Sequence, residues 1–142
     1  IVDGKLVFTA TAADFDHLAN GVEEEVVVTY TMSDETGTPI TSTATITVTG
    51  TNDLPTANVD TDVVNENNSV TVDVLANDTD LDDGATLTLD TVASDKGTVS
   101  IVDGKLVFTA TAADFDHLAN GVEEEVVVTY TMSDETGTPI TS

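Results

Sequence analysis

The sequence contains no cysteine, so no disulfide can hold a small domain together. A secreted domain without disulfides needs another staple, and bound metal ions are one. Aromatic residues make up only 4% of the chain, so each Phe and Tyr is expected to matter to a small core. No apolar run is long enough to span a bilayer, and no signal peptide is recognisable. We therefore expect a domain that relies on a small core and a non-covalent staple.

Positive charge is almost as scarce. The chain has 27 acidic residues, no arginine and three lysines (Lys5, Lys96 and Lys105), which gives a net charge of −24. Nucleic acid and anionic membranes are poor partners for such a surface. Strong acidity can also mark disorder, but 39% hydrophobic residues in alternating patterns argue against it. Two explanations of the acidity remain: a generic device for solubility in salty surroundings, and acids that bound metal neutralises. The clustering of acids in loops favours bound metal.

An exact internal repeat organises the chain. Residues 1–42 recur without a change as residues 101–142, so the period is 100 residues and the chain holds about 1.4 units. Such a period is too long for a solenoid coil and fits one small domain per repeat. The repeat predicts that these residues belong to a longer tandem array, with identical neighbouring repeats as partners in the same chain.

The hydrophobic pattern within one unit is that of an all-β protein. Short alternating segments are separated by turn signals at a spacing of roughly 8–12 residues, which is typical of an antiparallel sandwich. The strongest hairpin signal is Asp103-Gly104, and residues 111–121 have room for one helical turn. We predict a seven-stranded immunoglobulin/cadherin-like β-sandwich in tandem repeat, with strands at 56–64, 69–75, 85–92, 98–102, 105–110, 122–132 and, seen in the first copy, 41–49.

The repeat and the strand pattern divide the chain at the segment 50–55, Gly-Thr-Asn-Asp-Leu-Pro. We predict that residues 1–53 are a partial repeat with the last three strands, and that residues 54–142 are a repeat lacking its last strand. The strand 41–49 should not serve as that last strand within the same chain. It would have to cross a strand length of about 25–30 Å, whereas the joint spans only about 20 Å at full stretch. If Ser142 is a true chain end, strand complementation between molecules is expected; the alternative is that these residues are cut from a longer chain.

Acidic loops should gather at both ends of such a sandwich. If the first strand leads away from Asp53, the loop 77–84 and the turns at Asp103 and Asp134 lie at the Asp53 end. The turns at Glu66 and Asp95 and the loop with Asp114 and Asp116 then lie at the other end. The corresponding loop of the first copy should approach the joint from the preceding domain. The candidate ligands are Asn52, Asp53, Asn77, Asp78, Asp80, Asp82, Asp83, Asp134, Asp103, Glu66, Asp14 and Asp16.

The sharpest motif is the loop 77–84, Asn-Asp-Thr-Asp-Leu-Asp-Asp-Gly. Alternating carboxylates on a short loop bring several oxygens toward one point, and Ca²⁺ takes six to eight oxygen ligands with loose geometry. The spacing matches an EF-hand loop only in part, because Thr88 stands at the twelfth position and strands flank the loop. An acidic, solvated turn is the alternative. Four carboxylates within six residues repel one another unless a cation intervenes, which favours Ca²⁺ as the cofactor.

Three motifs in order carry a family resemblance. Residues 74–80, Val-Leu-Ala-Asn-Asp-Thr-Asp, resemble the bacterial cadherin-like repeats of large secreted adhesins. Residues 118–123 and 130–134, and the joint with the strand before it, resemble the VCBS repeats of the same proteins. The resemblance spans nearly the whole unit and implies an extender of an RTX-type adhesin, exported by type I secretion to the bacterial surface and rigidified by Ca²⁺. Glu135 stands where the family often has Gly, and the glycine-rich RTX nonapeptides are absent.

The resemblance and the residues together predict a calcium-dependent spacer that holds an adhesive tip away from a cell. An alternative is a glycan- or ice-binding module, which would need an exposed aromatic platform or a two-dimensional threonine array; the row Thr41 to Thr49 offers one line of threonines. An enzyme is least expected, because no nucleophile–base pair is recognisable. His17 and His117 are interpreted as loop histidines, and the three glutamates at 23–25 and 123–125 as charged strand ends.

Overall fold

A computed structural model describes all 142 residues, which form two compact units. Unit 1 consists of Ile1–Asp53 together with Leu81–Gly84, and unit 2 of Leu54–Asp80 with Ala85–Ser142. Strands dominate both units, and every strand pair is antiparallel. The all-β prediction is confirmed. No helix in the structure is long and apolar enough to cross a membrane.

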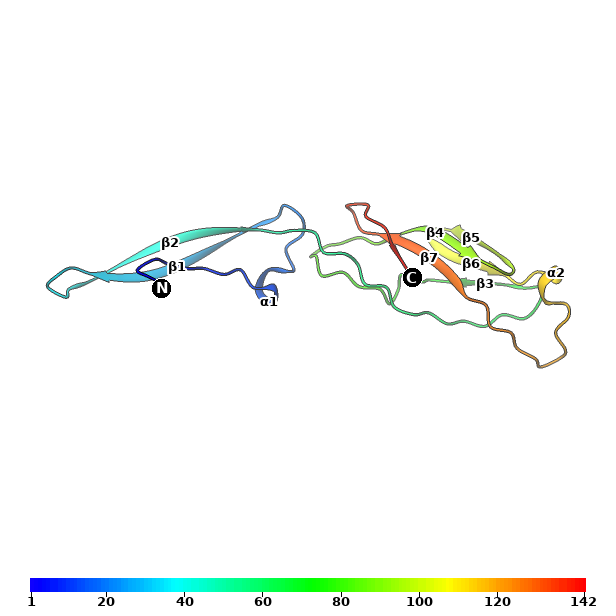
Figure 1. Cartoon of the computed structure of the whole chain (residues 1–142). Helices are drawn as coiled ribbons and strands as arrows, with labels where there is room; N and C mark the ends of the chain where they lie inside the picture. Colours follow the sequence, from blue (N-terminus) through cyan, green and yellow to red (C-terminus); the bar gives the residue numbers. More distant parts are fainter. The chain divides into compact units, whose positions relative to one another are not determined.

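Unit 1 is built on one long hairpin (Figure 1). Strand β1 (Glu23–Ser33) pairs over its whole length with β2 (Pro39–Thr49), from Glu23 opposite Thr49 to Ser33 opposite Pro39. Alternation places Val26 and Val28 on one half-buried face, beside Ile46 and Ala44 of the partner strand. A single helical turn, α1 (Ala12–Phe15), lies in the segment before the hairpin. Residues 1–10 form only one isolated bridge, between Val2 and Lys5.

Unit 2 contains two three-stranded sheets (Figure 1). One has the order β3-β6-β5, with β3 at Ser69–Val72, β6 at Lys105–Thr109 and β5 at Thr98–Val102. The other has the order β4-β7-β8, with β4 at Thr88–Ser94, β7 at Val128–Ser133 and β8 at Ile140–Thr141. The helical turn α2 (Ala112–Phe115) follows β6, as predicted for residues 111–121. Asp103 and Gly104 both have positive φ (50° and 75°) in the β5–β6 turn, as a type I′ turn requires.

The core of unit 2 lies between the two sheets. Leu106 and Phe108 of β6 contribute to it from one side, and Leu89 of β4 and Met132 of β7 from the other. Phe115 of α2 meets Phe108 edge to face, with ring centroids 6.3 Å apart. The other buried members are Val74, Ala110 and Tyr130. Two antiparallel sheets that share one apolar core are a β-sandwich.

The two identical stretches of sequence adopt different structures. Residues 101–110 form a hairpin in unit 2, whereas residues 1–10 form no strand. Met132 is fully buried while Met32 is 50% exposed, and Leu106 is 4% exposed while Leu6 is 41% exposed. In unit 2, residues from the segment 54–100, such as Val74 and Leu89, pack with these side chains in the core. Local sequence is the same, so the packing partners decide the difference.

Two predicted strands are absent: the first of the three expected in residues 1–53, where residues 1–10 form only a bridge, and the strand at 56–64. Residues 56–64 form no strand, and only Thr56 bridges to Thr79. Side-chain bonds take the place of strand pairing here: the N–H of Asn58 donates to Asp78 Oδ1 (2.7 Å). Val59, which was expected to face the core, is 85% exposed. The predicted strand 122–132 is shortened to β7 in unit 2, although the same residues of the first copy form the 11-residue strand β1. The other predicted strands are present with shifted ends, and β4 carries a bulge between Leu89 and Thr91.

Candidate metal centre

Within unit 1, Asp53 contacts the loop Leu81–Gly84. The N–H of Asp53 donates to Asp82 Oδ2 (3.0 Å), and the N–H of Asp83 donates to the carbonyl of His17 (2.8 Å). Asp82 is only 5% exposed, which is unusual for a carboxylate. The distal half of the predicted calcium loop is therefore held by one side-chain bond to the segment after β2 and one backbone bond to the segment after α1.

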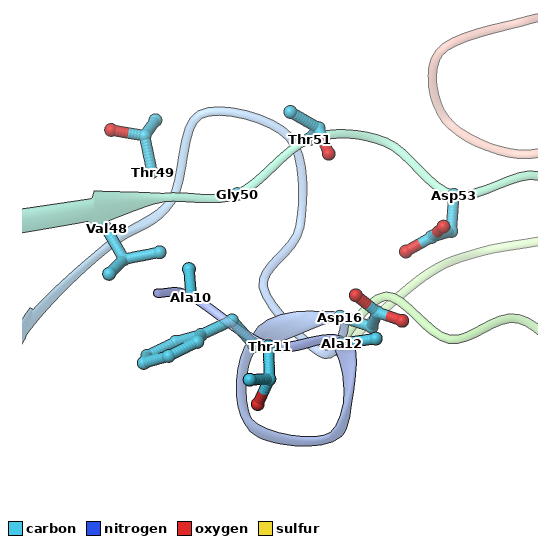
Figure 2. A pocket seen from close by; sticks show the side chains of 10 residues that line it. Ala10, Thr11, Ala12, Asp16, Val48, Thr49, Gly50, Thr51 and Asp53 are labelled. Atoms are coloured by element: carbon cyan, nitrogen blue, oxygen red, sulfur yellow. The ribbon is translucent and has the colours of Figure 1, made fainter. Parts of the chain in front are cut away.

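Asp16 and Asp53 line one shallow pocket of about 180 Å³. Figure 2 shows their carboxylates pointing toward each other across it, with Asp16 following α1 and Asp53 following β2. Thr11, Thr51 and the backbone at Gly50 line the rest of the rim. Two carboxylates that face the same space repel each other, and a cation between them would remove that repulsion. The prediction that Asp16 approaches Asp53 agrees with this arrangement; Asp14 instead accepts a hydrogen bond from Thr11 Oγ1 (2.6 Å).

Gly50 shapes this site by close approach. A Cβ at this position would lie 2.2 Å from the carbonyl oxygen of Leu18 and 2.4 Å from that of Ala19, closer than any side chain tolerates. The backbone of Gly50 also donates to the carbonyl of Val22 (2.7 Å) and accepts from the N–H of Gly21 (3.0 Å). Its φ is not positive, so glycine is required here because no side chain fits, not because of its backbone conformation.

The proximal half of the loop makes a second acidic cluster, in unit 2. Asp78 accepts from the N–H of Asn58 through Oδ1 (2.7 Å) and from the hydroxyl of Tyr130 through Oδ2 (3.1 Å). Asn77 donates through Nδ2 to Asp60 Oδ1 and to the carbonyl of Val59, both at 3.2 Å. Asn58 returns a bond from its Nδ2 to the carbonyl of Asn77 (2.8 Å). These bonds fasten residues 56–60 to residues 77–79.

Two pKa shifts follow from this packing. Burial raises the pKa of Asp60, and the nearby negative charge of Asp78 raises it further. The pKa of Tyr130 is also raised, first by burial and then because its hydroxyl donates to the Asp78 carboxylate. Asp60 Oδ2 is buried and has no hydrogen-bond partner. Asn58, Asp60 and Tyr130 were not among the predicted site residues, because their strand-like surroundings gave no ligand signal.

The remaining predicted ligands have local structural roles or are exposed. Asp134 is buried and caps its own turn, accepting from the N–H (2.7 Å) and the Oγ1 (2.6 Å) of Thr136. Asp103 sits in the exposed β5–β6 turn with a φ of 50°. Glu66 and Asp83 are exposed, and Asp80 is half-buried in unit 2.

Strand direction correctly predicted which loops meet within unit 2. At one end, the side chain of Asn67 donates to Asp116 Oδ1 (2.9 Å), and the N–H of Gly97 donates to Asp114 Oδ2 (3.0 Å). At the other, the N–H of Thr86 contacts Glu135 Oε2 at 3.4 Å. Glu135, which departs from the resembled family, therefore contacts the loop after residue 84.

The donor chemistry of unit 1 fits a hard cation, but the side chains do not form a closed cage. Nowhere in the chain do three or more His, Asp or Glu side chains stand together in a way that could hold a metal ion. The Oδ1 atoms of Asn52 and Asp82 are buried beside a pair of facing carboxylates, and all are oxygen donors of the kind that Ca²⁺ prefers. Ion binding would have to draw these oxygens closer together.

The comparison with protein families decides what this sandwich is. The bacterial Ig domain family model matches residues 52–142. The chain belongs to the bacterial Ig domain family. No curated protein and no solved structure matches the sequence.

Bacterial Ig domains are typically non-enzymatic and are often extracellular or surface-exposed. The match begins at Asn52, so it includes Asp53 and the whole of unit 2. Residues 1–42 have the same sequence as residues 101–142, which lie within the matched range.

Proposed function

We propose that this chain is part of a tandem bacterial Ig array that acts as a spacer in a large secreted surface adhesin, and that Ca²⁺ at the ends of the domains stiffens it. The observation that carries the spacer role is the exact 100-residue repeat within one Ig family. Identical domains in series add length without adding new binding surfaces. The resemblance to RTX-type, VCBS and cadherin-like repeats is based on the sequence motifs described above.

The side chains support a mechanical role over a catalytic one. All six aromatic residues are buried or half-buried, so none forms an exposed platform for a sugar. Both histidines lie next to glutamates, His17 Nε2 at 3.7 Å from Glu24 and His117 Nε2 at 3.4 Å from Glu124. Neither has a serine or threonine partner that would form a nucleophile–base pair. We infer that the chain is not an enzyme.

For the calcium site we propose Asp16, Asp53 and Asp82, with the amide oxygen of Asn52. These residues come from three separate segments, so an ion shared by them would tie the α1 region, the end of β2 and the loop Leu81–Gly84 into one body. A bound Ca²⁺ supplies positive charge that cancels the repulsion between carboxylates. The other predicted ligands in unit 2, such as Asn77, Asp78 and Asp80, are candidates for a second ion.

Connectivity gives this loop a mechanical consequence. The chain passes from one unit to the other at three points, after Asp53, after Asp80 and after Gly84. If Ca²⁺ fixes Leu81–Gly84 against Asp53, all three connecting segments are restricted at once. We therefore propose that calcium restricts bending between successive domains, since interdomain contacts are mobile by default.

Thermal unfolding with Ca²⁺, Mg²⁺ or chelator tests the proposal. Ca²⁺ in the millimolar range should raise the melting temperature of unit 1 by mass action, and Mg²⁺ should do much less. D53N should lose most of the calcium response. D103N is the matched control, because it removes the same charge from an exposed turn in which Asn is well tolerated. Equal melting temperatures in chelator and in Ca²⁺ would refute calcium binding but leave the spacer role standing.

Small-angle scattering tests the mechanical part. In Ca²⁺ the wild type should give a narrow distribution of dimensions, and chelator or D53N should broaden it. The D103N variant should scatter like the wild type in both conditions. Identical scattering of D53N and wild type in Ca²⁺ would remove Asp53 from the mechanism.

A glycan- or ice-binding surface is the second candidate, because the hairpin register gives it one observation. Thr29 lies opposite Thr43, and Thr31 opposite Thr41, so four threonines form a small exposed block on β1 and β2. Glu25 and Glu23 occupy the positions opposite Thr47 and Thr49, which limits the array to that block. Thermal hysteresis would favour ice binding, and a glycan-array signal above buffer would favour glycan binding. In either case the T31V/T43V variant should lose the signal.

A further inference from the structure

Two stretches of unit 2 carry the pattern Asn-X-Ser/Thr, which is the acceptor pattern for N-linked glycosylation. They are residues 67–69, Asn-Asn-Ser, and residues 77–79, Asn-Asp-Thr, and no other asparagine of the chain has Ser or Thr two residues later. Neither stretch has Pro in the middle position, which would block the reaction. The pattern makes a site only where an enzyme can reach the amide nitrogen on the surface. The structure therefore discriminates between the two stretches.

Asn67 lies in an exposed turn before β3. Residues 65–69 are all exposed, and the N–H of Asn68 donates to the carbonyl of Asn65 across the turn (3.2 Å). The φ of Asn67 is 63°, in the left-handed region that asparagine adopts more readily than most residues. Its own N–H donates to the carbonyl of Ala110 (2.9 Å). The side chain of Asn67 is thus presented to solvent from a backbone that is held in place.

The two asparagines differ in how many of their amide hydrogens are used. An asparagine amide has two N–H donors, and attachment of a sugar to the nitrogen replaces one of them. Asn67 Nδ2 donates one hydrogen bond, to Asp116 Oδ1 (2.9 Å). Asn77 Nδ2 donates two, to the carbonyl of Val59 and to Asp60 Oδ1, both at 3.2 Å. A sugar on Asn67 is therefore compatible with its bond to Asp116, whereas a sugar on Asn77 removes one of its two bonds.

The residues that follow each asparagine differ in the same direction. Asn68 is exposed and its side chain bonds only within the turn, and the hydroxyl of Ser69 shares a hydrogen bond with Thr109 at the surface (2.7 Å). Asp78 is half-buried and accepts a hydrogen bond from the hydroxyl of the core residue Tyr130 (3.1 Å). Moving residues 67–69 into the active site of an enzyme therefore disturbs only surface contacts, whereas moving residues 77–79 disturbs a contact with the core.

The surroundings of Asn67 suit a neutral, hydrated group. Glu66 and Asp116 beside it are exposed acids, and the whole chain carries a charge of −24. A sugar adds bulk and hydration at this turn without adding further charge. Bacterial Ig domains are often extracellular or surface-exposed, and N-linked sugars belong on surface loops of exported proteins.

We propose that Asn67 is an acceptor for N-linked glycosylation. Asn67 Nδ2 attacks the anomeric carbon of a phosphate-activated sugar. The carbon–nitrogen bond forms as the bond from that carbon to the phosphate oxygen breaks, the phosphate leaves with the electron pair, and one amide proton passes to a base of the glycosyltransferase. The donor is a nucleotide-activated sugar or a sugar carried on a lipid pyrophosphate, which share this chemistry. The assignment depends neither on the spacer role nor on calcium binding.

Glycosylation in vitro tests the choice between the two asparagines. The enzyme is an N-glycosyltransferase that modifies free peptides of residues 64–71 and 74–81 with a nucleotide-activated hexose. In the folded chain it should modify Asn67 roughly tenfold faster than Asn77, because a sugar on Asn77 removes a hydrogen bond. N67Q and S69A should lose the main product. N77Q is the matched control and should keep it.

Intact mass and sequencing of the modified peptides give the outcome. Modification of the folded chain at Asn67, with little at Asn77, supports the assignment. Equal rates at the two asparagines, or a faster rate at Asn77, overturn it. A folded chain that stays unmodified under conditions in which both peptides react also overturns it.

Protein isolated from the cells that produce it shows whether the site is used and from which donor. The peptide of residues 64–71 should carry sugar on Asn67. A series of forms that differ by single sugars indicates nucleotide-activated donors, and one oligosaccharide of fixed mass indicates the lipid-linked donor. An unmodified Asn67 throughout the isolated protein overturns the proposal.

Discussion

Met32 and Met132 form an internal comparison, because the same residue in the same local sequence is half-exposed in unit 1 and fully buried in unit 2. Replacing Met132 by Ala leaves a cavity between Leu89, Phe108 and their neighbours in the core. Truncations of this kind cost about 2–5 kcal/mol. Replacing Met32 by Ala removes a side chain that keeps half of its surface in water and opens no enclosed cavity. Its cost should be about 1 kcal/mol at most.

Thermal unfolding measures both costs in one protein. M132A is followed through Tyr130 in a Y30F background, and M32A through Tyr30 in a Y130F background. For a unit of this size, each kcal/mol shifts the melting temperature by about 4–8 °C, so M132A should lower it by about 8 °C or more. Equal destabilisation by the two substitutions would refute the reasoning. It would mean that Met32 is covered in solution by something that the structure of one chain lacks.

Three further predictions concern single residues. D60N should stabilise unit 2 at neutral pH. Because the pKa of Asp60 is raised in the folded state, the stability of the wild type falls as the pH rises through that pKa. The difference from wild type should vanish below about pH 3.8, and urea unfolding across a range of pH checks this. G50A should destabilise unit 1 by about 1–3 kcal/mol, since its Cβ would lie 2.2 Å from a backbone oxygen, with the Tyr130 signal unchanged. Y130F should cost about 1 kcal/mol by removing the bond to Asp78, whereas Y30F should be neutral; equal effects would contradict the Asp78 contact.

The sequence alone determined the class of fold and the arrangement of turns. Alternating β-branched residues, Asp103-Gly104 and the spacing of turn signals predicted the β5–β6 hairpin and the helical turn at 112–115. These features depend on interactions within about ten residues, and local patterns are sufficient for them. The meeting of the Glu135 and Thr86 loops also followed from counting strand directions.

Tertiary structure alone decided which copy of this ten-residue stretch forms a buried hairpin. The stretch from Ile101 is a buried hairpin and the identical stretch from Ile1 is not, so no local rule could separate them. The strand predicted at 56–64 was lost because Asp78 takes the N–H of Asn58, a contact across 20 residues that the alternation of Ala57 and Val59 does not show. The role of Gly50 likewise depends on the carbonyls of Leu18 and Ala19, which lie far away in sequence. A strand or a close contact exists only when its partner is present, and partners are a property of the whole fold.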